Sequence, residues 1–262
     1  MNPDFLAIDI GNTHMTLGLM RELEVVHSFK LSSKKSAADL LPDFRAGVTA
    51  FPSSAGGAYR GDAQPIQAAI ASVNPPATAV AEKLVHDVLG VKAIVLGRDR
   101  LFPVENRAAR PEQVGADRLI NALAAWHFVK GSAIVVDFGT AITFDVVSAD
   151  GAYLGGAIAP GIMLAMKALH DNTALIPLVR PEPDPPALGR DTVSAVNAGV
   201  YHGYVGLARN ILEELFKEFP KRPRVISTGG DGNYIAPRIG LIDDVMPHLT
   251  LQGIRLAHDA PR

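Results

Sequence analysis

The chain has 262 residues, of which 48% are hydrophobic and 20% charged, with a formal net charge of −2 and no cysteine. This balance is typical of a globular protein with a substantial core, and the weak negative charge does not favour a nucleic-acid partner. The absence of cysteine excludes disulfides, a cysteine nucleophile and cysteine-ligated metal centres. No apolar stretch reaches the roughly 20 residues that span a bilayer, and no basic leader precedes the first strand, so we expect a cytoplasmic protein with no membrane partner.

The first part of the chain predicts a sheet that begins with three strands around a tight turn. Phe5–Ile10 and Met15–Met20 are expected to be strands joined by a turn at residues 11–13, and Glu24–Leu31 is expected to be a third strand of an antiparallel meander. Further on we expect helices at Ser36–Ala46 and Thr78–Leu89 and strands at Pro65–Val73 and Lys92–Leu96. Residues 51–65 are rich in glycine, serine and proline, which predicts a surface loop.

The second part begins with a helix and then repeats the three-strand order. Ala116–Lys130 has an apolar stripe at helical spacing and is followed by Gly131. A second meander is predicted from Ala133–Asp137, Thr140–Val147 and Tyr153–Ile158. After it we expect helices at Gly161–Asp171, 192–219 and Leu249–His258 and strands at Val225–Ser227 and Ile242–Val245. The chain is therefore predicted to be an α/β protein with two duplicated lobes, residues 1–114 and 115–262, and a cleft between them.

Both parts contain an acidic residue and a glycine turn between two apolar runs. The first copy reads DIGNT at 9–13, and the second reads DFGTAIT at 137–143. Glycine allows the backbone to turn tightly beside a ligand, and successive N–H groups form an anion-binding concavity. Asp9 can also hold Mg²⁺, which prefers carboxylates together with phosphates. A plain β-hairpin turn is the alternative for either copy, but the recurrence favours a paired site for nucleotide phosphates.

A third glycine-containing turn, STGGDG at 227–232, follows a short apolar strand. Its adjacent glycines allow a flat ligand such as adenine with its ribose to lie against the backbone. An ordinary strand-to-helix turn is the alternative. The sequence contains neither a GxxxxGK[ST] P-loop nor a GxGxxG motif, so the nucleotide hypothesis depends on the paired acidic turns.

An acid and a base stand side by side in GADR at 115–118, where a polar loop becomes a predicted helix. Asp117 can accept a proton while Arg118 binds a carboxylate or a phosphate. The alternative is a helix start in which Asp117 only interacts with the helix dipole, although Arg118 is unfavourable there. Thr192 precedes the long predicted helix and is expected to be its N-cap unless it binds a ligand. The eight histidines show no metal-ligand spacing.

Taken in order, these motifs resemble the type III pantothenate kinase family, of the acetate and sugar kinase/Hsp70/actin superfamily, over almost the whole chain. The segments concerned are DIGNT at 9–13, SVNPP at 73–77, PEQVGADR at 111–118, DFGTAITFD at 137–145, GGAIAPG at 155–161, GRDTVSAVNAG at 189–199, STGGDG at 227–232 and PHLTLQGI at 247–254. The resemblance implies two actin-like, ribonuclease H-like lobes with mixed sheets. It also implies that a homodimer uses ATP to phosphorylate the primary hydroxyl of pantothenate, the first step toward coenzyme A.

The resemblance further implies roles for individual residues. Those implied to bind the phosphates of ATP and Mg²⁺ are Asp9, Ile10, Gly11, Asn12, Thr13, His14, Met15 and Thr16, with Thr140 as a further nucleotide contact. Those implied to hold pantothenate are Gly115, Ala116, Asp117, Arg118 and Thr192, and Asp117 is also the implied general base. Asp137 is the position implied to bind a monovalent cation, K⁺ or NH₄⁺. The partner subunit is implied to complete the pantothenate pocket.

One position departs from the family pattern. Relatives often carry a substrate-contacting tyrosine seven residues before the glycine of GADR, where this chain has Ala108. That contact is missing here or is supplied by another residue. Two other functions remain open at this point: a non-catalytic actin-like switch protein that binds a nucleotide, and a kinase that acts on another small hydroxyl compound.

Overall fold

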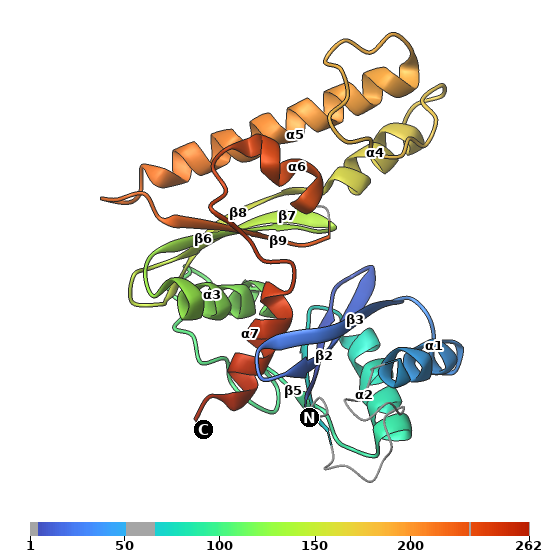
Figure 1. Cartoon of the computed structure of the whole chain (residues 1–262), viewed down its shortest axis with the longest axis vertical. Coiled ribbons are helices and arrows are strands. Elements are labelled where there is room, and N and C mark those ends of the chain that lie inside the picture. Colours follow the sequence, from blue (N-terminus) through green and yellow to red (C-terminus); the bar gives the residue numbers. More distant parts are fainter. Residues whose placement is uncertain (1–4, 51–65, 231, 262) are drawn as a thin grey trace. The chain divides into compact units, whose positions relative to one another are not determined.

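The computed structural model describes residues 5–50, 66–230 and 232–261, without the side chains of residues 232–234. The predicted surface loop at 51–65 lies outside these residues. The chain forms two compact units (Figure 1): the first runs to Ala124 and includes the end of the chain from His248, and the second is Ala125–Pro247. The lobes 1–114 and 115–262 stay a prediction, because they divide the chain at its duplicated motifs and not by packing.

The sheet of the first unit has five strands in the order β3-β2-β1-β4-β5. Its antiparallel part consists of β1 (Phe5–Ile10), β2 (His14–Arg21) and β3 (Glu24–Ser32), which confirms the predicted meander. Its parallel part adds β4 (Gln67–Ser72) beside β1 and the short β5 (Ile94–Val95) beside β4. Parallel neighbours need crossover connections, and these are supplied by the helices α1 (Ala37–Thr49) and α2 (Pro75–Leu89).

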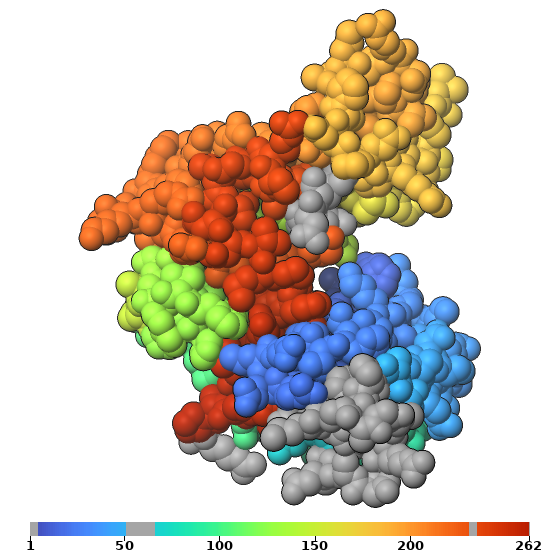
Figure 2. Space-filling view, viewed as in Figure 1, coloured from blue at the N-terminus to red at the C-terminus, as the bar shows by residue number. Residues whose placement is uncertain are grey.

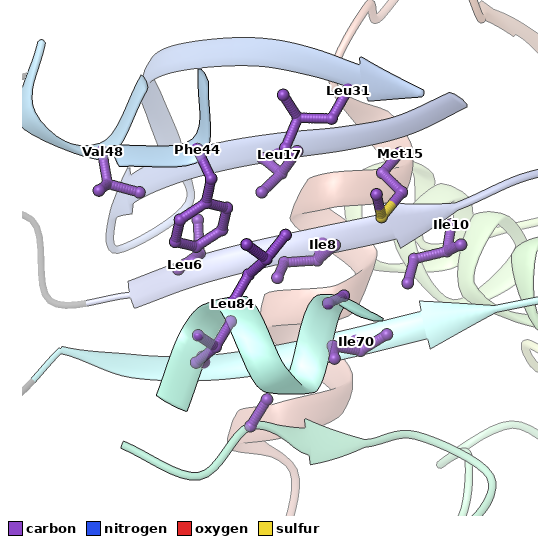
Figure 3. Packing of buried hydrophobic residues seen from close by; sticks show 14 of the residues in the cluster. Leu6, Ile8, Ile10, Met15, Leu17, Leu31, Phe44, Val48, Ile70 and Leu84 are labelled. Carbon is purple, nitrogen blue, oxygen red and sulfur yellow. The ribbon is translucent and has the colours of Figure 1, made fainter. Parts of the chain in front are cut away.

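Alternation along β1 decides which of its side chains face which helices. One set packs with α1 and α2 in the core shown in Figure 3, which includes Leu6, Ile8, Ile10, Phe44 and Leu84. The other set, Phe5 and Ala7, belongs to a core with residues of α7 (Leu249–Asp259). Because successive strand residues point to opposite sides, Asp9 lies on the α7 side of the sheet.

The sheet of the second unit has the order β10-β9-β6-β7-β8. Its meander consists of β6 (Ala133–Phe138), β7 (Ala141–Val147) and β8 (Tyr153–Pro160), and its parallel strands are β9 (Arg224–Thr228) and β10 (Asp244–Val245). Taken from β8, this order matches the first sheet strand for strand. The predicted α/β class with two duplicated mixed sheets is therefore confirmed.

The helices of the second unit are α4 (Ile162–Asp171), α5 (Thr192–Phe216) and α6 (Gly232–Ile239). Residues of all three pack with β6, β7 and β9 in one apolar core, and Figure 1 shows α5 and α6 on the same side of the sheet. A short 3₁₀ helix, η1 (Pro111–Gln113), precedes α3 (Ala116–Val129), which begins in the first unit. Within the described ranges, no helix combines the length and the apolarity that crossing a membrane requires.

The sequence-based elements differ from the structure mainly at their ends. α2 begins at Pro75 and not at Thr78, because the Asn74 side chain accepts a hydrogen bond from Ala77 N at 3.3 Å and proline suits the first helical position. α5 ends at Phe216, three residues earlier than expected, and β5 is shorter than the apolar run that predicted it.

The close approach of α7 to α3 depends on Gly253. A Cβ at this position would lie 2.5 Å from Ile120 O and 2.7 Å from Ile120 Cγ2. We expect Gly253→Ala to lower the free energy of unfolding by about 1–3 kcal/mol in urea titrations, because the two helices must separate to admit the methyl group. Gly206→Ala in α5 is the matched control: a Cβ there meets no atom within 4 Å, and the variant should gain about 0.5–1 kcal/mol. Equal effects of the two substitutions would contradict this account of the packing.

Candidate active site

The two acidic turns occupy equivalent places in the two sheets. β1 and β6 are both six residues long, and in each the first four residues are buried, the fifth is partly exposed and the sixth is buried. The fifth residue is Asp9 in β1 and Asp137 in β6. The duplication seen in the sequence therefore places a carboxylate at the same position near the end of the first strand of each meander.

The neighbours of the two aspartates differ in one position. On the antiparallel side, Asp9 is paired with Thr16 and its counterpart in β6 is paired with Thr143. On the parallel side, the first aspartate has Ala71 as its partner and the second has Thr228. Paired residues of a sheet lie on the same face, so the second carboxylate has a threonine on both sides and the first has one.

The turn after Asp9 is fixed by contacts with its own hairpin and with the end of β3. Gly11 N donates to His14 O at 3.0 Å, and Ser33 N donates to Thr13 O at 3.1 Å. The Ser33 hydroxyl donates to Gly11 O at 2.8 Å. These bonds hold the backbone of the predicted phosphate turn from two strands.

The residues predicted to bind ATP phosphates divide by exposure. Ile10 and Met15 have side chains in the core of Figure 3, so they can contact a nucleotide only through their backbone. Asn12 and His14 are exposed, and the two threonines of the run, at positions 13 and 16, are partly exposed. A ligand at this turn would therefore meet backbone N–H groups, hydroxyls and the Asn12 amide.

Asp117 lies in the first turn of α3, close to the end of the first sheet. Val73 follows β4, and its N–H donates to Ile10 O at 3.0 Å, which extends the pairing beyond the strand. A Cβ on Gly115 would lie 3.4 Å from Val73 Cγ1 and would overlap Asp117 Oδ1. By the alternation of β4, Val73 points to the α7 side, where Asp9 also lies. The structure therefore brings the GADR segment and the first acidic turn to the same side and the same end of one sheet.

Burial dominates the electrostatics of Asp117. Loss of solvent raises the pKa of the Asp117 carboxyl above its ordinary value, because the charged form is the one that desolvation disfavours. The Arg118 N–H, which donates to Asp117 Oδ1 at 2.9 Å, and the Arg118 guanidinium act in the opposite direction but do not cancel the effect of burial. A carboxyl of this kind takes up a proton more readily than an exposed aspartate does.

The second acidic turn is packed against the end of β9. Gly229 has a φ of +89°, and a Cβ there would lie 2.5 Å from Asp137 Oδ1 and from Phe138 O. Only glycine fits between β9 and the Asp137 turn. Thr140, in the same turn, is exposed. Residue 231 lies outside the described part of the chain, so the proposed adenine contact of STGGDG stays a prediction.

The prediction that Thr192 is an N-cap is wrong. The N-cap of α5 is Asp191, whose carboxylate accepts from Ser194 N at 2.9 Å, while Ser194 Oγ accepts from Asp191 N at 3.1 Å. Because aspartate is as good a cap as threonine and serine at the third helical position completes a capping box, the cap forms one residue earlier. The hydroxyl of Thr192, which is exposed, is not used by the cap.

The loop around Ala108 is held by hydrogen bonds with the side chain of Asn106. Asn106 Oδ1 accepts from Ala108 N at 3.1 Å, and Asn106 Nδ2 donates to Pro111 O at 3.2 Å. This asparagine therefore fixes the loop that leads into η1 and the GADR segment.

The metal-binding capacity of the site depends on Asp9 and Asp137. In the parts of the chain that the structure describes, no group of three or more histidine, aspartate or glutamate side chains could hold a metal ion. Asp9 and Asp137 belong to different units, and each lies beside a turn of backbone amides and hydroxyls. Such a donor set fits Mg²⁺ only if phosphate oxygens complete the coordination, which is how Mg²⁺ is usually held with nucleotides.

Comparisons with known proteins agree on one family. The family model described as type III pantothenate kinase matches residues 5–214. A type III pantothenate kinase of Geotalea uraniireducens is 37% identical over 257 residues, which are 98% of each chain. One of Pelobacter propionicus is 36% identical over 258 residues, 98% of this chain and 99% of the relative.

A comparison of structures shows the fold. A ROK family glucokinase from Streptomyces griseus, solved in complex with glucose and AMPPNP, matches with a TM-score of 0.53 at 14% identity, over 98% of this chain and 99% of that one. The two duplicated mixed sheets thus have the fold of actin-like ATPases and ROK kinases, as the motifs implied. Because the family model spans most of the chain and the relatives match nearly all of it, the chain belongs to the type III pantothenate kinase family.

Proposed function

We propose that the chain transfers the γ-phosphoryl group of ATP to the primary hydroxyl of pantothenate, with Asp117 as the general base. The family supplies the reaction, which is the ATP-dependent phosphorylation of pantothenate in coenzyme A biosynthesis. The observation that carries the residue assignment is the place of Asp117, partly buried at the end of the first sheet on the side where Asp9 lies. Phosphoryl transfer depends mainly on positioning and charge stabilisation, and this arrangement puts a proton acceptor beside a phosphate-binding turn.

In this mechanism the Asp117 carboxylate accepts the proton of the pantothenate hydroxyl as that oxygen attacks phosphorus. A raised pKa suits the role, because a base works best when its pKa approaches the working pH. Gly115 leaves the space that the carboxylate occupies. Arg118, next to the base, is proposed to bind the substrate carboxylate through paired N–H donors. Gly115, Ala116 and the exposed Thr192 complete the proposed pantothenate contacts.

The nucleotide is proposed to bind the run from Asp9 to Thr16. The N–H groups after Gly11, the Asn12 amide and the threonine hydroxyls are donors of the kind that phosphate oxygens accept. Mg²⁺, when bound, would neutralise phosphate charge, and the carboxylate of Asp9 fits it on the condition that phosphates supply further oxygens. Thr140 is proposed as a separate nucleotide contact from the second unit.

A monovalent cation, K⁺ or NH₄⁺, is proposed to bind at Asp137. The pairing of this aspartate with Thr143 and Thr228 supports the proposal, because it sets two hydroxyl-bearing residues beside one carboxylate. The equivalent position in the first unit has alanine in place of the second threonine. The proposal thus assigns different ions to the two copies of one turn.

A homodimer is proposed from exposed apolar side chains on α4 and on the segment that connects it to α5. These side chains are Met163, Leu164, Leu169, Leu175, Leu178 and Leu188, and the exposed Val193 follows at the start of α5. Figure 2 shows this region, in yellow and orange, at the surface. Contiguous exposed apolar groups are typical of interaction surfaces, and Thr192 lies within the same stretch of chain. The absence of nucleic-acid and membrane partners and a cytoplasmic location stay predictions from the sequence.

The activity is tested by incubating the protein with ATP, Mg²⁺, K⁺ and pantothenate and measuring phosphopantothenate by mass spectrometry. We expect product from the wild type, and Asp117→Asn should lower kcat by about 10²- to 10⁴-fold with unchanged affinity for an ATP analogue. A variant with near wild-type kcat would remove Asp117 from the mechanism. A wild type that binds ATP but phosphorylates only another hydroxyl compound, or none, would overturn the proposed substrate.

The raised pKa of Asp117 predicts how the same variant changes stability. A carboxyl whose pKa is higher in the folded state stabilises the fold in its protonated form and loses this contribution as pH rises through that pKa. Asp117→Asn should therefore unfold at a higher urea concentration than the wild type at neutral pH, and the difference should disappear as pH falls toward the ordinary value of 3.8. Asp39→Asn is the control, because hydrogen bonds from Ser36 lower the pKa of Asp39 and no such gain is expected. A neutral-pH loss of stability in Asp117→Asn would contradict the assignment.

The dimer is tested by sedimentation velocity. We expect a dimer for the wild type and a monomer for the double variant Leu175→Asp with Leu188→Asp, because charges on side chains that are 89% and 71% exposed would oppose their burial. Leu101→Asp is the matched control, since this leucine is 83% exposed but lies in the first unit. The proposed dimer interface would be contradicted if Leu101→Asp dissociates the dimer and the double variant does not.

A further inference from the structure

The turn that carries Thr140 is in contact with the segment that leaves β8. Gly161 N donates a hydrogen bond to Thr140 O at 3.0 Å. A methyl group on Gly161 would overlap the carbonyl groups of Gly139 and Thr140. The backbone at residues 160–161 therefore sits directly against the turn, and a shift of this backbone would move Thr140.

A tyrosine of α5 holds this segment. The hydroxyl of Tyr204 donates to Pro160 O at 2.9 Å and lies 3.4 Å from Gly161 O. Pro160 is the last residue of β8 and is paired with Ala141 of β7, so the bond is made where the strand ends beside the turn. Burial raises the pKa of the Tyr204 phenol, which keeps it a proton donor at neutral pH.

We propose that Tyr204 is a positioning residue for the nucleotide, which sets the place of the Thr140 backbone through Pro160 and Gly161. In this proposal Tyr204 acts on the turn through this backbone and is assigned no contact with a reacting atom. The proposal rests on the proposed function in one respect, since it assumes that Thr140 contacts ATP.

The hydroxyl can be separated from the packing of the ring. The ring of Tyr204 belongs to the apolar core of the second unit, so Tyr204→Phe keeps the packing and removes one donor. Pro160 O then loses its partner, and the segment at 160–161 is held less firmly. Because Thr140 is exposed and outside the core, we expect the lost hydrogen bond to change nucleotide affinity more than the free energy of unfolding.

Tyr201→Phe is the matched control. Tyr201 is also buried, lies about one turn earlier in the same helix and belongs to the same core. Its hydroxyl is a hydrogen-bond partner of Arg238, which lies in α6. Both variants remove one phenolic hydroxyl from the same unit, but only Tyr204→Phe is expected to loosen the turn that carries Thr140.

The experiment compares the full-length wild type with the two variants. We expect Tyr204→Phe to raise the KM for ATP and the Kd of an ATP analogue about three- to tenfold, as the loss of one hydrogen bond allows, with the KM for pantothenate unchanged. The Gly161 amide should exchange with deuterium faster in this variant. Tyr201→Phe should leave all of these values at the wild-type level.

Two results would overturn the proposal: wild-type ATP affinity in Tyr204→Phe, or an equal loss of ATP affinity in both variants, which would indicate general loosening of the core. The analogue Kd and the Gly161 exchange do not depend on which compound is phosphorylated. If the wild type makes no phosphopantothenate but binds the analogue, the proposed substrate fails while the role of Tyr204 is still decided by these two measurements.

Discussion

Two glycines leave the space that two carboxylates occupy, and the chemistry proposed for this chain depends on that space. Asp117 lies where a methyl group on Gly115 would lie, and Asp137 lies 2.5 Å from the place of a Cβ on Gly229. In each case the carboxylate lies close to backbone that carries no side chain, and each aspartate is only partly exposed. Burial raises the pKa of Asp117, and the missing Cβ of Gly229 leaves room for the end of β9 beside the second turn. The carboxylates proposed as the proton acceptor and as the cation ligand thus both lie in space left by a glycine.

The duplication is compatible with the two different roles proposed for one motif. Both sheets have the same strand order, and both aspartates are the fifth residue of a six-residue strand with the same burial pattern. The difference lies in the parallel neighbour, which is Ala71 in the first unit and Thr228 in the second. The GADR segment stands beside the first copy only. One fold unit used twice therefore supplies a turn next to the proposed base and a second turn with more oxygen donors, without any change in backbone topology.

The sequence predicted what is encoded locally. Runs of apolar residues predicted the strands of both meanders, and the shared aspartate and glycine predicted the two turns. Strands and tight turns depend mainly on residues that are neighbours along the chain. Helix starts were predicted less well, because the caps of α2 and α5 are Asn74 and Asp191, which lie before the expected starts at Thr78 and Thr192, and the choice depends on side-chain geometry. The place of α7 beside β1 and α3 could not be predicted from the sequence. It depends on contacts between distant parts of the chain, such as that of Gly253 with Ile120, more than a hundred residues away.

The role proposed for Tyr204 shows why a site can depend on residues that no motif contains. Its partner Pro160 is 44 positions away, so periodicity along α5 marks Tyr204 only as a core residue. The same helix carries Thr192 at its start, about three turns earlier, next to a capping box that fixes its first turn. A long helix that is capped at one end and bonded to β8 farther along can hold a proposed substrate contact and the Thr140 turn in one rigid frame. The loop at Ala108 is held in a similar way, because the Asn106 side chain bonds the backbone on both sides of it. In both places the backbone is positioned by one polar side chain from outside the motif, so substitutions that keep the motifs intact can still change nucleotide or substrate affinity.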